Sequence, residues 1–303
     1  MTDLKTIHSA RVKESIKPLF EDKKEQRGLF LKSSTDIGVI RNNGRNGARY
    51  APKAFMFNFK KMTQDQDLKN WSFAEIEVSS EEHELKNFSE AQKLESSKIQ
   101  EALKSSYDFI CHIGGGHDHI YPLIRAQASS FDKVVVINID AHADTRTDAE
   151  AHSGTPFRQL DQEISQFRLF QIGLHPYSNS FSTLSPLKSE MKVLWKQECQ
   201  ETEINSFFEK IKSEVTDKTL VTLSVDADAL CGHLVPGVSA VNADGLDLNT
   251  LKFIMSKYLE LNLSHSPVLG VYELNPIYDQ LSGVSMNTIA NFVFHTLKVC
   301  QKK

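Results

Sequence analysis

The chain contains a series of short apolar runs, and several of them end directly in an acid or a histidine. In the clearest case, residues 134–139 are almost entirely apolar and are followed at once by Asp140-Ala141-His142-Ala143-Asp144. A bounded apolar run of this length is typical of a strand that is buried on both faces of a parallel sheet. Open α/β sheets bind their ligands at the carboxyl ends of such strands. The sequence therefore favours a parallel α/β fold with polar chemistry at one edge.

Three further apolar runs end in the same way. Residues 109–113 lead through three glycines to His117, residues 220–223 lead to Asp226 and Asp228, and residues 268–272 lead to Glu273. Taken singly, an aspartate after a strand is equally well explained as a helix N-cap, and His117 as a capping or packing residue. Taken together, they sit where parallel strands bring their ends to one edge. We therefore expect a single site composed of His117, Asp140, His142, Asp144, Asp226 and Asp228.

The order of the runs predicts the architecture. Apolar runs alternate with helix-like segments from about residue 88 onward, which predicts one α/β domain over residues 1–303. We expect a three-layer, doubly wound and mostly parallel sheet. Residues 1–30 are charged and weakly periodic, and we interpret them as an irregular N-terminal arm or short helices. Residues 37–40 are interpreted as the first strand. Helices are expected at 88–106 (with Ser89 as N-cap), 202–214, 248–260 and 284–299, and later strands at 168–172, 191–195, 219–225 and 267–272.

Composition narrows the classes of function. With 35 basic against 39 acidic residues and no dense basic stripe, the chain is not expected to bind nucleic acid. The absence of a run of membrane length or a signal-peptide pattern predicts a cytoplasmic protein that does not enter a membrane. The cysteines are scattered and match neither a zinc spacing nor a disulfide framework. They are Cys111, Cys199, Cys231 and Cys300.

The charge of the expected site predicts metal binding. Four aspartates in a small volume would repel one another and raise one another's pKa unless a cation held them. Two divalent ions carry the charge that four aspartates balance. Imidazole and carboxylate ligands without thiolate suit Mn²⁺, Fe²⁺, Co²⁺, Ni²⁺ or Zn²⁺ rather than Ca²⁺. Two such ions about 3.5 Å apart can convert a bridging water into a hydroxide nucleophile near neutral pH.

The arrangement resembles the ureohydrolase family, which includes arginases, agmatinases and formimidoylglutamases. The resemblance runs from about residue 37 to the C-terminal helix and rests on these segments: Gly114-Gly115-Gly116-His117, Asp140-Ala141-His142-Ala143-Asp144, Ser224-Val225-Asp226-Ala227-Asp228 and Glu273-Leu274-Asn275-Pro276. It implies an arginase-like fold with two Mn²⁺ ions, bridged by Asp140 and Asp226. His117 and Asp144 would complete the shell of one ion, and His142 and Asp228 that of the other. Family analogy also suggests a homo-oligomer.

Several loops are most similar to those of formimidoylglutamases. These are residues 43–49, the run Ser153-Gly154-Thr155-Pro156-Phe157-Arg158, and residues 236–240. The chain departs from the common Asp-Pro after the third metal segment, where it has Ala229-Leu230. That departure affects a loop rather than a ligand, so it bears on the substrate and not on metal binding.

The expected substrate is a planar amidine or guanidine. Glu273 is suited to hold the cationic head group through charge-assisted hydrogen bonds. His152 has two interpretations that are equally supported, a proton shuttle to the leaving amine or a surface histidine of the loop. His175 and Asn179 follow another strand, and Asn179 is predicted to line the pocket and contact substrate. An acidic tail would require guanidinium groups.

Arginines are concentrated in two loops expected beside the site. Five of the nine arginines lie there. Arg158 and Arg45 are predicted to contact substrate, whereas Arg49 and Arg146 are predicted to hold loops to neighbouring carboxylates. This enrichment favours an acidic substrate. Together with it, the resemblance to formimidoylglutamases implies N-formimidoyl-L-glutamate, which would be split into L-glutamate and formamide in histidine breakdown. The alternatives are a guanidino-compound hydrolase that releases urea and, in another class, a non-catalytic metal-binding regulator. A single-zinc deacetylase is disfavoured by His142, Asp144 and Glu273.

Overall fold

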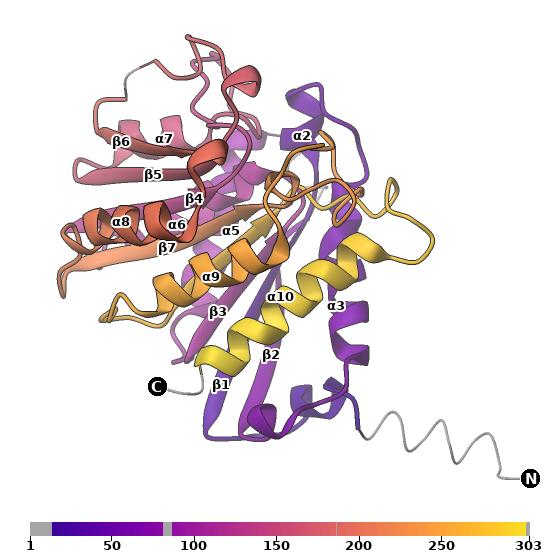
Figure 1. The fold of residues 1–303 in the computed structure, drawn as a ribbon. Helices are drawn as coiled ribbons and strands as arrows, with labels where there is room; N and C mark the ends of the chain where they lie inside the picture. The colour runs from indigo at the N-terminus through magenta and orange to yellow at the C-terminus, as the bar shows by residue number, and fades with distance from the viewer. Residues whose placement is uncertain (1–13, 81–86, 186, 301–303) are drawn as a thin grey trace, which may run out of the picture.

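A single parallel sheet organises the molecule. The computed structural model describes residues 14–80, 87–185 and 187–300 (Figure 1). In this part of the chain, eight strands pair in the order β2-β1-β3-β8-β7-β4-β5-β6, and every pair is parallel. The strands are β1 Gln26–Ser34, β2 Trp71–Ser80, β3 Phe109–Gly114, β4 Lys133–Ile139, β5 Phe167–Leu174, β6 Glu190–Trp195, β7 Thr219–Asp226 and β8 Val268–Tyr272.

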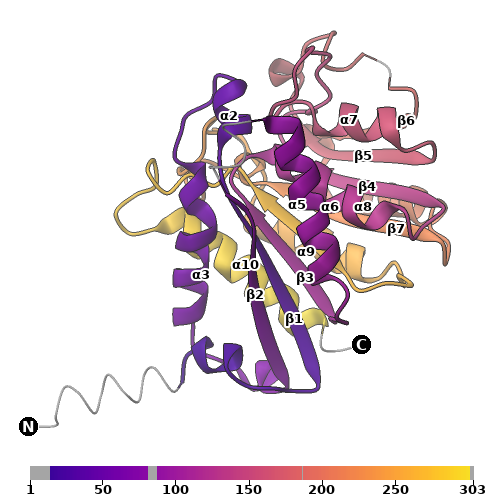
Figure 2. The same cartoon turned by 180° about the vertical axis from the view of Figure 1, so that it is seen from behind.

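Helices cover both faces of the sheet, which makes three layers (Figures 1 and 2). The α-helices are α2 Ile37–Arg41, α3 Ala51–Lys61, α5 Phe88–Ala102, α6 Ile120–Ala128, α7 Pro156–Glu163, α8 Glu201–Lys212, α9 Leu248–Leu259 and α10 Val284–Cys300. Apolar side chains of α3, α8, α9 and α10 pack on one face, and those of α5, α6 and α7 pack on the other. Short 3-10 turns are η1 Lys17–Phe20, η2 Ala48–Tyr50, η3 Gln66–Leu68, η4 His117–His119, η5 Pro176–Ser178, η6 Lys196–Glu198 and η7 Ala227–Ala229.

The central strands are apolar because both of their faces are covered. In β4, Val135 and Ile137 pack into the core on the α8–α10 side, while Val134 and Val136 pack into the core on the α5–α7 side. Successive side chains of a strand point to opposite faces, so a strand buried on both sides needs apolar residues at nearly every position. This explains why a continuous apolar run predicted β4 correctly.

The three-layer parallel architecture is confirmed, and the strands and helices expected beyond residue 88 are present with small shifts of their ends. The helix expected at 88–106 is α5, which ends at Ala102. Its N-cap is not Ser89 but Asn87, whose side-chain oxygen accepts the N–H of Glu90.

The prediction of a first strand at residues 37–40 was wrong. These residues belong to the short helix α2. A four-residue apolar run does not distinguish the two, and Gly38 packs so closely on Asp118 that a Cβ would lie 2.0 Å from its carboxylate. Of the stretch expected as an irregular arm or short helices, η1 is a short helix at Lys17–Phe20, and β1 begins at Gln26. Residues 1–13 lie outside the described residues.

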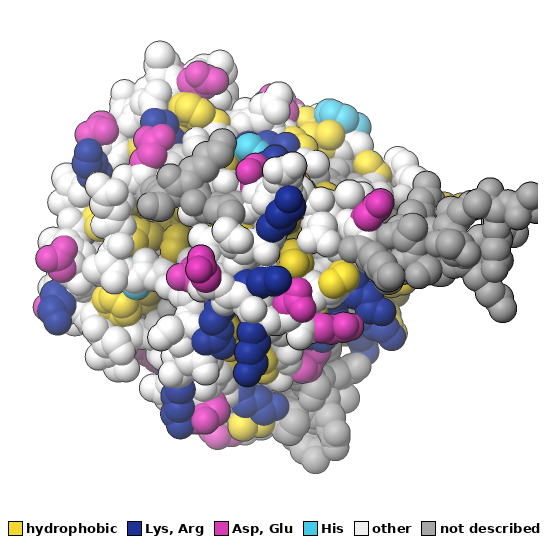
Figure 3. Space-filling model, turned by 90° about the horizontal axis from the view of Figure 1, so that it is seen from below, with side chains coloured by type: hydrophobic (Ala, Val, Ile, Leu, Met, Phe, Trp, Pro, Cys, Tyr) yellow, Lys and Arg dark blue, Asp and Glu magenta, His cyan; other side chains and the backbone are white. Residues whose placement is uncertain are grey.

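The two edges of the sheet differ in character. Figure 3 views the molecule from the end at which β1 begins, where lysine and arginine side chains are interspersed with acidic ones. The strands end at the opposite edge, where loops and short turns gather (Figure 1). Among the described residues, no helix combines the length and apolar character needed to cross a membrane.

Candidate metal centre and its cavity

The predicted ligands meet because four strands that carry them are neighbours. β3, β8, β7 and β4 are consecutive in the sheet. Asp140 directly follows β4, Asp226 is the last residue of β7, and His117 opens the turn η4 after β3. Glu273 directly follows β8. Parallel strands place their carboxyl ends at one edge, so residues far apart in sequence come together there.

The first group of ligand atoms surrounds His117, which is fully buried. Its Nδ1 atom lies 2.9 Å from Asp144 Oδ2, 3.1 Å from Asp140 Oδ2 and 3.2 Å from Asp226 Oδ2. Its Nε2 atom lies 2.8 Å from the hydroxyl of Ser224. With Nε2–H donating to Ser224, the Nδ1 lone pair faces the three carboxylates, which is the arrangement a cation requires.

The second group surrounds His142, which is more open to the cavity. His142 Nδ1 lies 3.3 Å from Asp228 Oδ2 and 3.6 Å from Asp140 Oδ1. The His142 side chain is 34% exposed, whereas those of Asp140 and Asp228 are buried. Asp140 contributes to both groups, and within each group the potential ligand atoms all lie within 4.8 Å of one another.

The electrostatics of the cluster fit a bound cation. Burial and repulsion from Asp140 raise the pKa of Asp144 and of Asp226 to about 6. Burial and repulsion from Asp226 raise the pKa of Asp228 to about 7. Buried groups charge reluctantly unless a counter-charge is near. His117 Nδ1 and Asp228 Oδ1 are buried and form no hydrogen bond to the described residues. Carboxylate and imidazole donors of this kind suit a divalent transition metal, so the residues fit the expected ions.

Amide side chains hold the loop that carries Asp140 to Asp144. Asn138 Nδ2 donates to Asp140 Oδ2 at 3.2 Å and to Gln171 at 2.8 Å. Gln171 in turn donates to the carbonyl of Ala143. Asn179 accepts the N–H of Ala143 and donates to the carbonyls of Ala141 and His175. The loop is thus fixed through its backbone, even though Asp144 has a left-handed φ of 50°.

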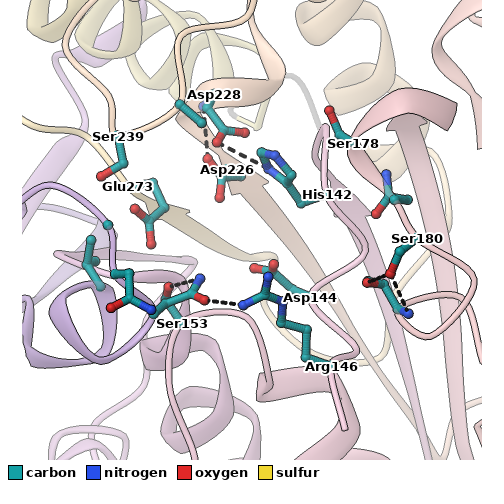
Figure 4. Close-up of a pocket in the computed structure, with 17 residues that line it drawn as sticks. His142, Asp144, Arg146, Ser153, Ser178, Ser180, Asp226, Asp228, Ser239 and Glu273 are labelled. Atoms are coloured by element: carbon teal, nitrogen blue, oxygen red, sulfur yellow. Dashed lines mark hydrogen bonds and ion pairs between the residues drawn. The ribbon is translucent and has the colours of Figure 1, made fainter. Parts of the chain in front are cut away.

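Glu273 is locked beside the first group. Its backbone N–H donates to the carbonyl of Gly115 at 2.8 Å, and its Oε1 accepts the backbone N–H of His117 at 3.0 Å. It has a left-handed φ of 63°, which is rare for a residue other than glycine. Burial, together with the charge of Asp226, raises the pKa of Glu273 well above its usual range. The carboxyl group faces the cavity next to the metal cluster (Figure 4).

A polar cavity of about 430 Å³ opens over the cluster (Figure 4). The end of the cavity beside the metal cluster, which we call the metal end, carries His142, Asp144, Asp226, Asp228 and Glu273. Elsewhere its walls carry hydroxyl and amide side chains, and Arg146 is the one lysine or arginine among the residues that line it in the described part of the chain. The remaining lining residues are Val39, Asn42, Asn43, Gly44, Ser153, Ser178, Asn179, Ser180, Thr183, Ser239 and Ala240.

The two arginines predicted to contact substrate do not line this cavity. Arg158 donates through Nε and Nη2 to the carbonyl of Thr145, and through Nη2 to Ser185. Arg45 donates twice to the carbonyl of Ser239, and its guanidinium lies 4.5 Å from the ring centre of Tyr278. Both guanidinium groups therefore join loops, which is the role we had expected of Arg49 and Arg146.

Arg49 and Arg146 both make the loop contacts expected of them. Arg49 pairs with the buried Asp36 at 3.0 Å. Arg146 Nη1 donates to the side chain of Asn42 at 2.6 Å and lies 4.0 Å from Asp148 Oδ2, and Arg146 also lines the cavity, which was not expected. Sequence alone does not show whether the side chain of a loop residue points into a cavity. The one indication that Arg146 could line the cavity was its position two residues after Asp144.

His152 is also outside the cavity lining. Its Nδ1 accepts the N–H of Gly154 at 3.1 Å, and its Nε2 lies 2.9 Å from Asp148 Oδ2. Because Nδ1 accepts, Nε2 carries the proton and donates to Asp148. His152 is buried, so it is not a surface histidine, and its contacts are made within its own loop. Its role as a proton shuttle stays a prediction. Asn179 does line the cavity, but its amide is engaged with the loop that carries His142.

The chain is similar in sequence to known proteins of one family. A family model described as the arginase family matches residues 35–298. A formimidoylglutamase of Rhodococcus opacus is 28% identical over 296 residues, covering 94% of this chain and 90% of the relative. One from Nocardia farcinica is 29% identical over 285 residues, covering 92% and 88%.

Solved structures share the fold. A Trypanosoma cruzi formiminoglutamase with Mn²⁺ superposes with a TM-score of 0.77 at 24% identity and covers 95% of this chain and 99% of its own. A Bacillus subtilis formimidoylglutamase has a TM-score of 0.78 at 22% identity, with coverage of 92% and 88%.

Proposed function

Because this chain belongs to the arginase family of metal-dependent amidinohydrolases, we propose that its substrate is N-formimidoyl-L-glutamate, which it hydrolyses to L-glutamate and formamide. The similarity to relatives named formimidoylglutamase over most of the chain supports this substrate. The observation that carries the proposal is the division of the cavity, with carboxylates at one end and a single arginine among neutral polar groups elsewhere.

The metal end would hold two divalent ions, which we propose to be Mn²⁺. His117, Asp140, Asp144 and Asp226 would hold one, and Asp140, His142 and Asp228 the other. When bound, two such ions supply positive charge and activate a water molecule for attack on the amidine carbon. The side chains of the protein would bind and orient the substrate.

Glu273 would bind the head group of the substrate. The amidinium of formimidoylglutamate is planar and cationic, and a carboxylate accepts its N–H groups in charge-assisted hydrogen bonds. The contact between Glu273 Oε1 and the N–H of His117 fixes the carboxyl group next to the metal cluster. The head group would then be oriented with its carbon toward the ligands of β4 and β7.

Arg146 would bind a carboxylate of the glutamate tail. Its guanidinium is half exposed and lines the cavity, together with the amide of Asn42 and the hydroxyls of Ser153 and Ser180. Guanidinium is the side chain best suited to a carboxylate, and hydroxyl and amide groups can donate to the second one. Among the described residues, the carboxylates that line the cavity all belong to the metal end. Asp148 lies outside the lining and is 4.0 Å from Arg146, so a cationic tail such as that of agmatine has no counter-charge in the rest of the cavity wall.

The overall reaction forms one bond and breaks one. The water oxygen bonds to the formimidoyl carbon, and the bond from that carbon to the glutamate nitrogen breaks. Both protons of the water pass to the leaving nitrogen of the amidinium, which departs as the ammonium group of L-glutamate, while the carbon leaves in formamide. The same reaction on a guanidino compound would release urea.

The test is a substrate panel with the manganese-loaded protein. Formimidoylglutamate, arginine, agmatine and guanidinobutyrate are assayed in parallel, and formamide, urea and the amine product are quantified. Formamide from formimidoylglutamate alone is the expected result. Urea from any other member would favour the guanidino-compound hydrolase, and no product from the panel in a protein that binds Mn²⁺ would favour the non-catalytic regulator.

A further inference from the structure

A second group of buried polar side chains lies behind the metal cluster. Glu95 of α5 is 1% exposed, an unusual position for a carboxylate. Its Oε1 accepts the hydroxyl of Ser33 at 2.6 Å, and both of its oxygens lie within 3.0 Å of Nδ1 of His119. Ser33 also contacts Nε2 of His112 at 2.8 Å, and Nδ1 of His112 contacts the hydroxyl of Tyr272 at 3.1 Å. These contacts form one continuous hydrogen-bonded chain.

The donor of each hydrogen bond between Tyr272 and Glu95 can be assigned. The one hydroxyl proton of Ser33 goes to Glu95, so Nε2 of His112 must carry the proton in its bond to Ser33. Burial lowers the pKa of His112 to about 3, so this imidazole is neutral and its Nδ1 is an acceptor. The hydroxyl of Tyr272 therefore donates to His112. Every hydrogen bond runs in one direction, from Tyr272 to the Glu95 carboxylate.

The ring of Tyr272 packs closely against two glycines, Gly114 of β3 and Gly270 of β8. A Cβ at Gly114 would lie 2.7 Å from the Tyr272 ring, and a Cβ at Gly270 would lie 2.4 Å from its hydroxyl. Any larger residue at either position would displace the ring. The backbones of β3 and β8 thus fix the ring on its flat side, and the hydrogen bond to His112 fixes its hydroxyl end.

The ring held in this way lies against the predicted metal ligand His117. The two rings are stacked, with centroids 5.2 Å apart and planes inclined by 25°. Phe157 meets the His117 imidazole edge-on, with centroids 5.4 Å apart and an angle of 87°. His117 is therefore confined between two aromatic rings, of which Tyr272 alone is tied to a polar network.

We propose that Tyr272 is a positioning residue for the metal ligand His117, and that the buried hydrogen-bonded chain through His112 and Ser33 to Glu95 holds the Tyr272 ring in place. The inference rests on the proposed role of His117 as a ligand. A ligand whose ring is already oriented loses less freedom on binding, and residues that orient ligands change metal affinity by about 10- to 100-fold. Tyr272 acts through His117 and makes no contact with the reacting atoms.

The experiment measures Mn²⁺ affinity directly, by calorimetric titration of the metal-free protein, for the wild type, Tyr272→Phe and Tyr272→Leu. Tyr272→Leu removes the ring and is expected to weaken Mn²⁺ binding at the site that contains His117 by about 10- to 100-fold. Tyr272→Phe keeps the ring but releases it from His112, and the expected loss is smaller, at the lower end of that range, about 10-fold. At saturating Mn²⁺, kcat of Tyr272→Phe should return to about that of the wild type, which a residue engaged in the chemistry would not allow.

The matched control is Tyr258→Phe. Tyr258 is also fully buried, and its hydroxyl bonds to Val221 and Val268, near the start of the strands and away from the cluster. It should keep wild-type Mn²⁺ affinity. The proposal is overturned if either Tyr272 variant binds Mn²⁺ as the wild type does, or if Tyr258→Phe loses as much affinity as Tyr272→Phe. Should Tyr272→Leu not fold, Tyr272→Phe still decides. A wild-type protein that fails to bind Mn²⁺ would contradict the proposed function instead.

Discussion

The two halves of the metal cluster are built from the same kinds of residue but are held in different ways. His117 is fully buried, bonded to Ser224 and enclosed between Tyr272 and Phe157. His142 is 34% exposed on the cavity wall, and the support of its loop comes from backbone contacts to Asn179 and Gln171. One half belongs to the packed interior of the protein, and the other belongs to the surface of a cavity.

This difference separates two tasks of a hydrolytic metal site. A pre-oriented ligand loses little freedom on binding, so the group around the fully buried His117 should retain its ion more firmly. In the second group Asp140 and Asp228 are buried as well, but His142 is 34% exposed, so its ion should exchange more readily. We therefore expect one tight and one weak site for Mn²⁺, and the predictions below test that comparison in order of decreasing effect.

The largest effect is expected from Asp140→Asn, because Asp140 is the carboxylate that both halves contact. The amide has the same shape but lacks the charge, so both binding phases should weaken and turnover should fall below detection. Calorimetric titration and the formamide assay measure the two quantities. Wild-type turnover in Asp140→Asn would contradict a shared ligand.

His117→Ala and His142→Ala should each remove one phase of Mn²⁺ binding, but not the same one. His117→Ala is expected to abolish the tight phase and His142→Ala the weak phase. The same titration distinguishes them, with partial chelation by EDTA as a second measure, since the weak ion should leave the wild type first. If His142→Ala abolished the tight phase, the assignment of affinity to burial would be reversed.

Arg146→Ala should affect substrate binding without affecting either ion. A hydrogen bond to a charged group contributes about 1.5–3 kcal/mol, so KM for formimidoylglutamate should rise by about 10- to 150-fold with kcat little changed. Steady-state kinetics at saturating Mn²⁺ give both values. Arg125→Ala on α6, whose partner is Glu163, is the control and should leave KM unchanged. An unchanged KM in Arg146→Ala would remove Arg146 from the tail site.

Asn179→Ala should weaken both phases of Mn²⁺ binding, because Asn179 holds the loop that carries Asp140, His142 and Asp144. It leaves the N–H of Ala143 and the carbonyl of Ala141 without their partner, and each buried group left unpaired costs about 1–3 kcal/mol. We expect a lower denaturation midpoint and weaker Mn²⁺ binding in calorimetric titration. Wild-type Mn²⁺ affinity in this variant would show that the loop keeps its ligands in place without Asn179.

The smallest effect is expected in the pH dependence of stability, measured on the metal-free protein so that loss of metal does not contribute. Burial lowers the pKa of His265 below its ordinary value of 6.5, and its Nε2 accepts the N–H of Val221 at 2.9 Å. A depressed folded pKa contributes stability that is present above pH 6.5 and is lost as the pH falls toward the folded pKa. Urea midpoints of the metal-free protein should decline below pH 6.5 and decline less in His265→Gln. Equal slopes would exclude His265 as a cause.

The sequence predicted the strands whose two faces are both buried in the sheet. β4 appears as a nearly continuous apolar run and β7 as a run in which apolar residues alternate with Thr and Ser. Their ends carry acids that no apolar core would accept. β1 escaped detection because Arg27 and Lys32 flank only a few apolar residues. Its Lys32 is accommodated by Glu75 and Glu77 of the neighbouring strand β2, a pairing that exists only after the strands have met.

The metal ligands could be predicted because strand ends constrain them, whereas the arginines could not. Arg146 and Arg158 lie in or beside one loop, and their guanidinium groups turn to different partners that are themselves loop atoms. Glu95 was missed for a related reason. An acid inside an amphipathic helix is expected to be exposed, and its burial becomes intelligible only when Ser33 and His119 are seen beside it.

Two residues of the centre, Asp144 and Glu273, hold left-handed backbone conformations that glycine would adopt without penalty. Replacing either residue with glycine would therefore be expected to relieve about 1 kcal/mol or more of conformational cost. It would also remove a ligand or the head-group carboxylate. A search for heat-resistant forms of this enzyme that screened by folding alone would be drawn to these two positions and would recover robust but inactive proteins.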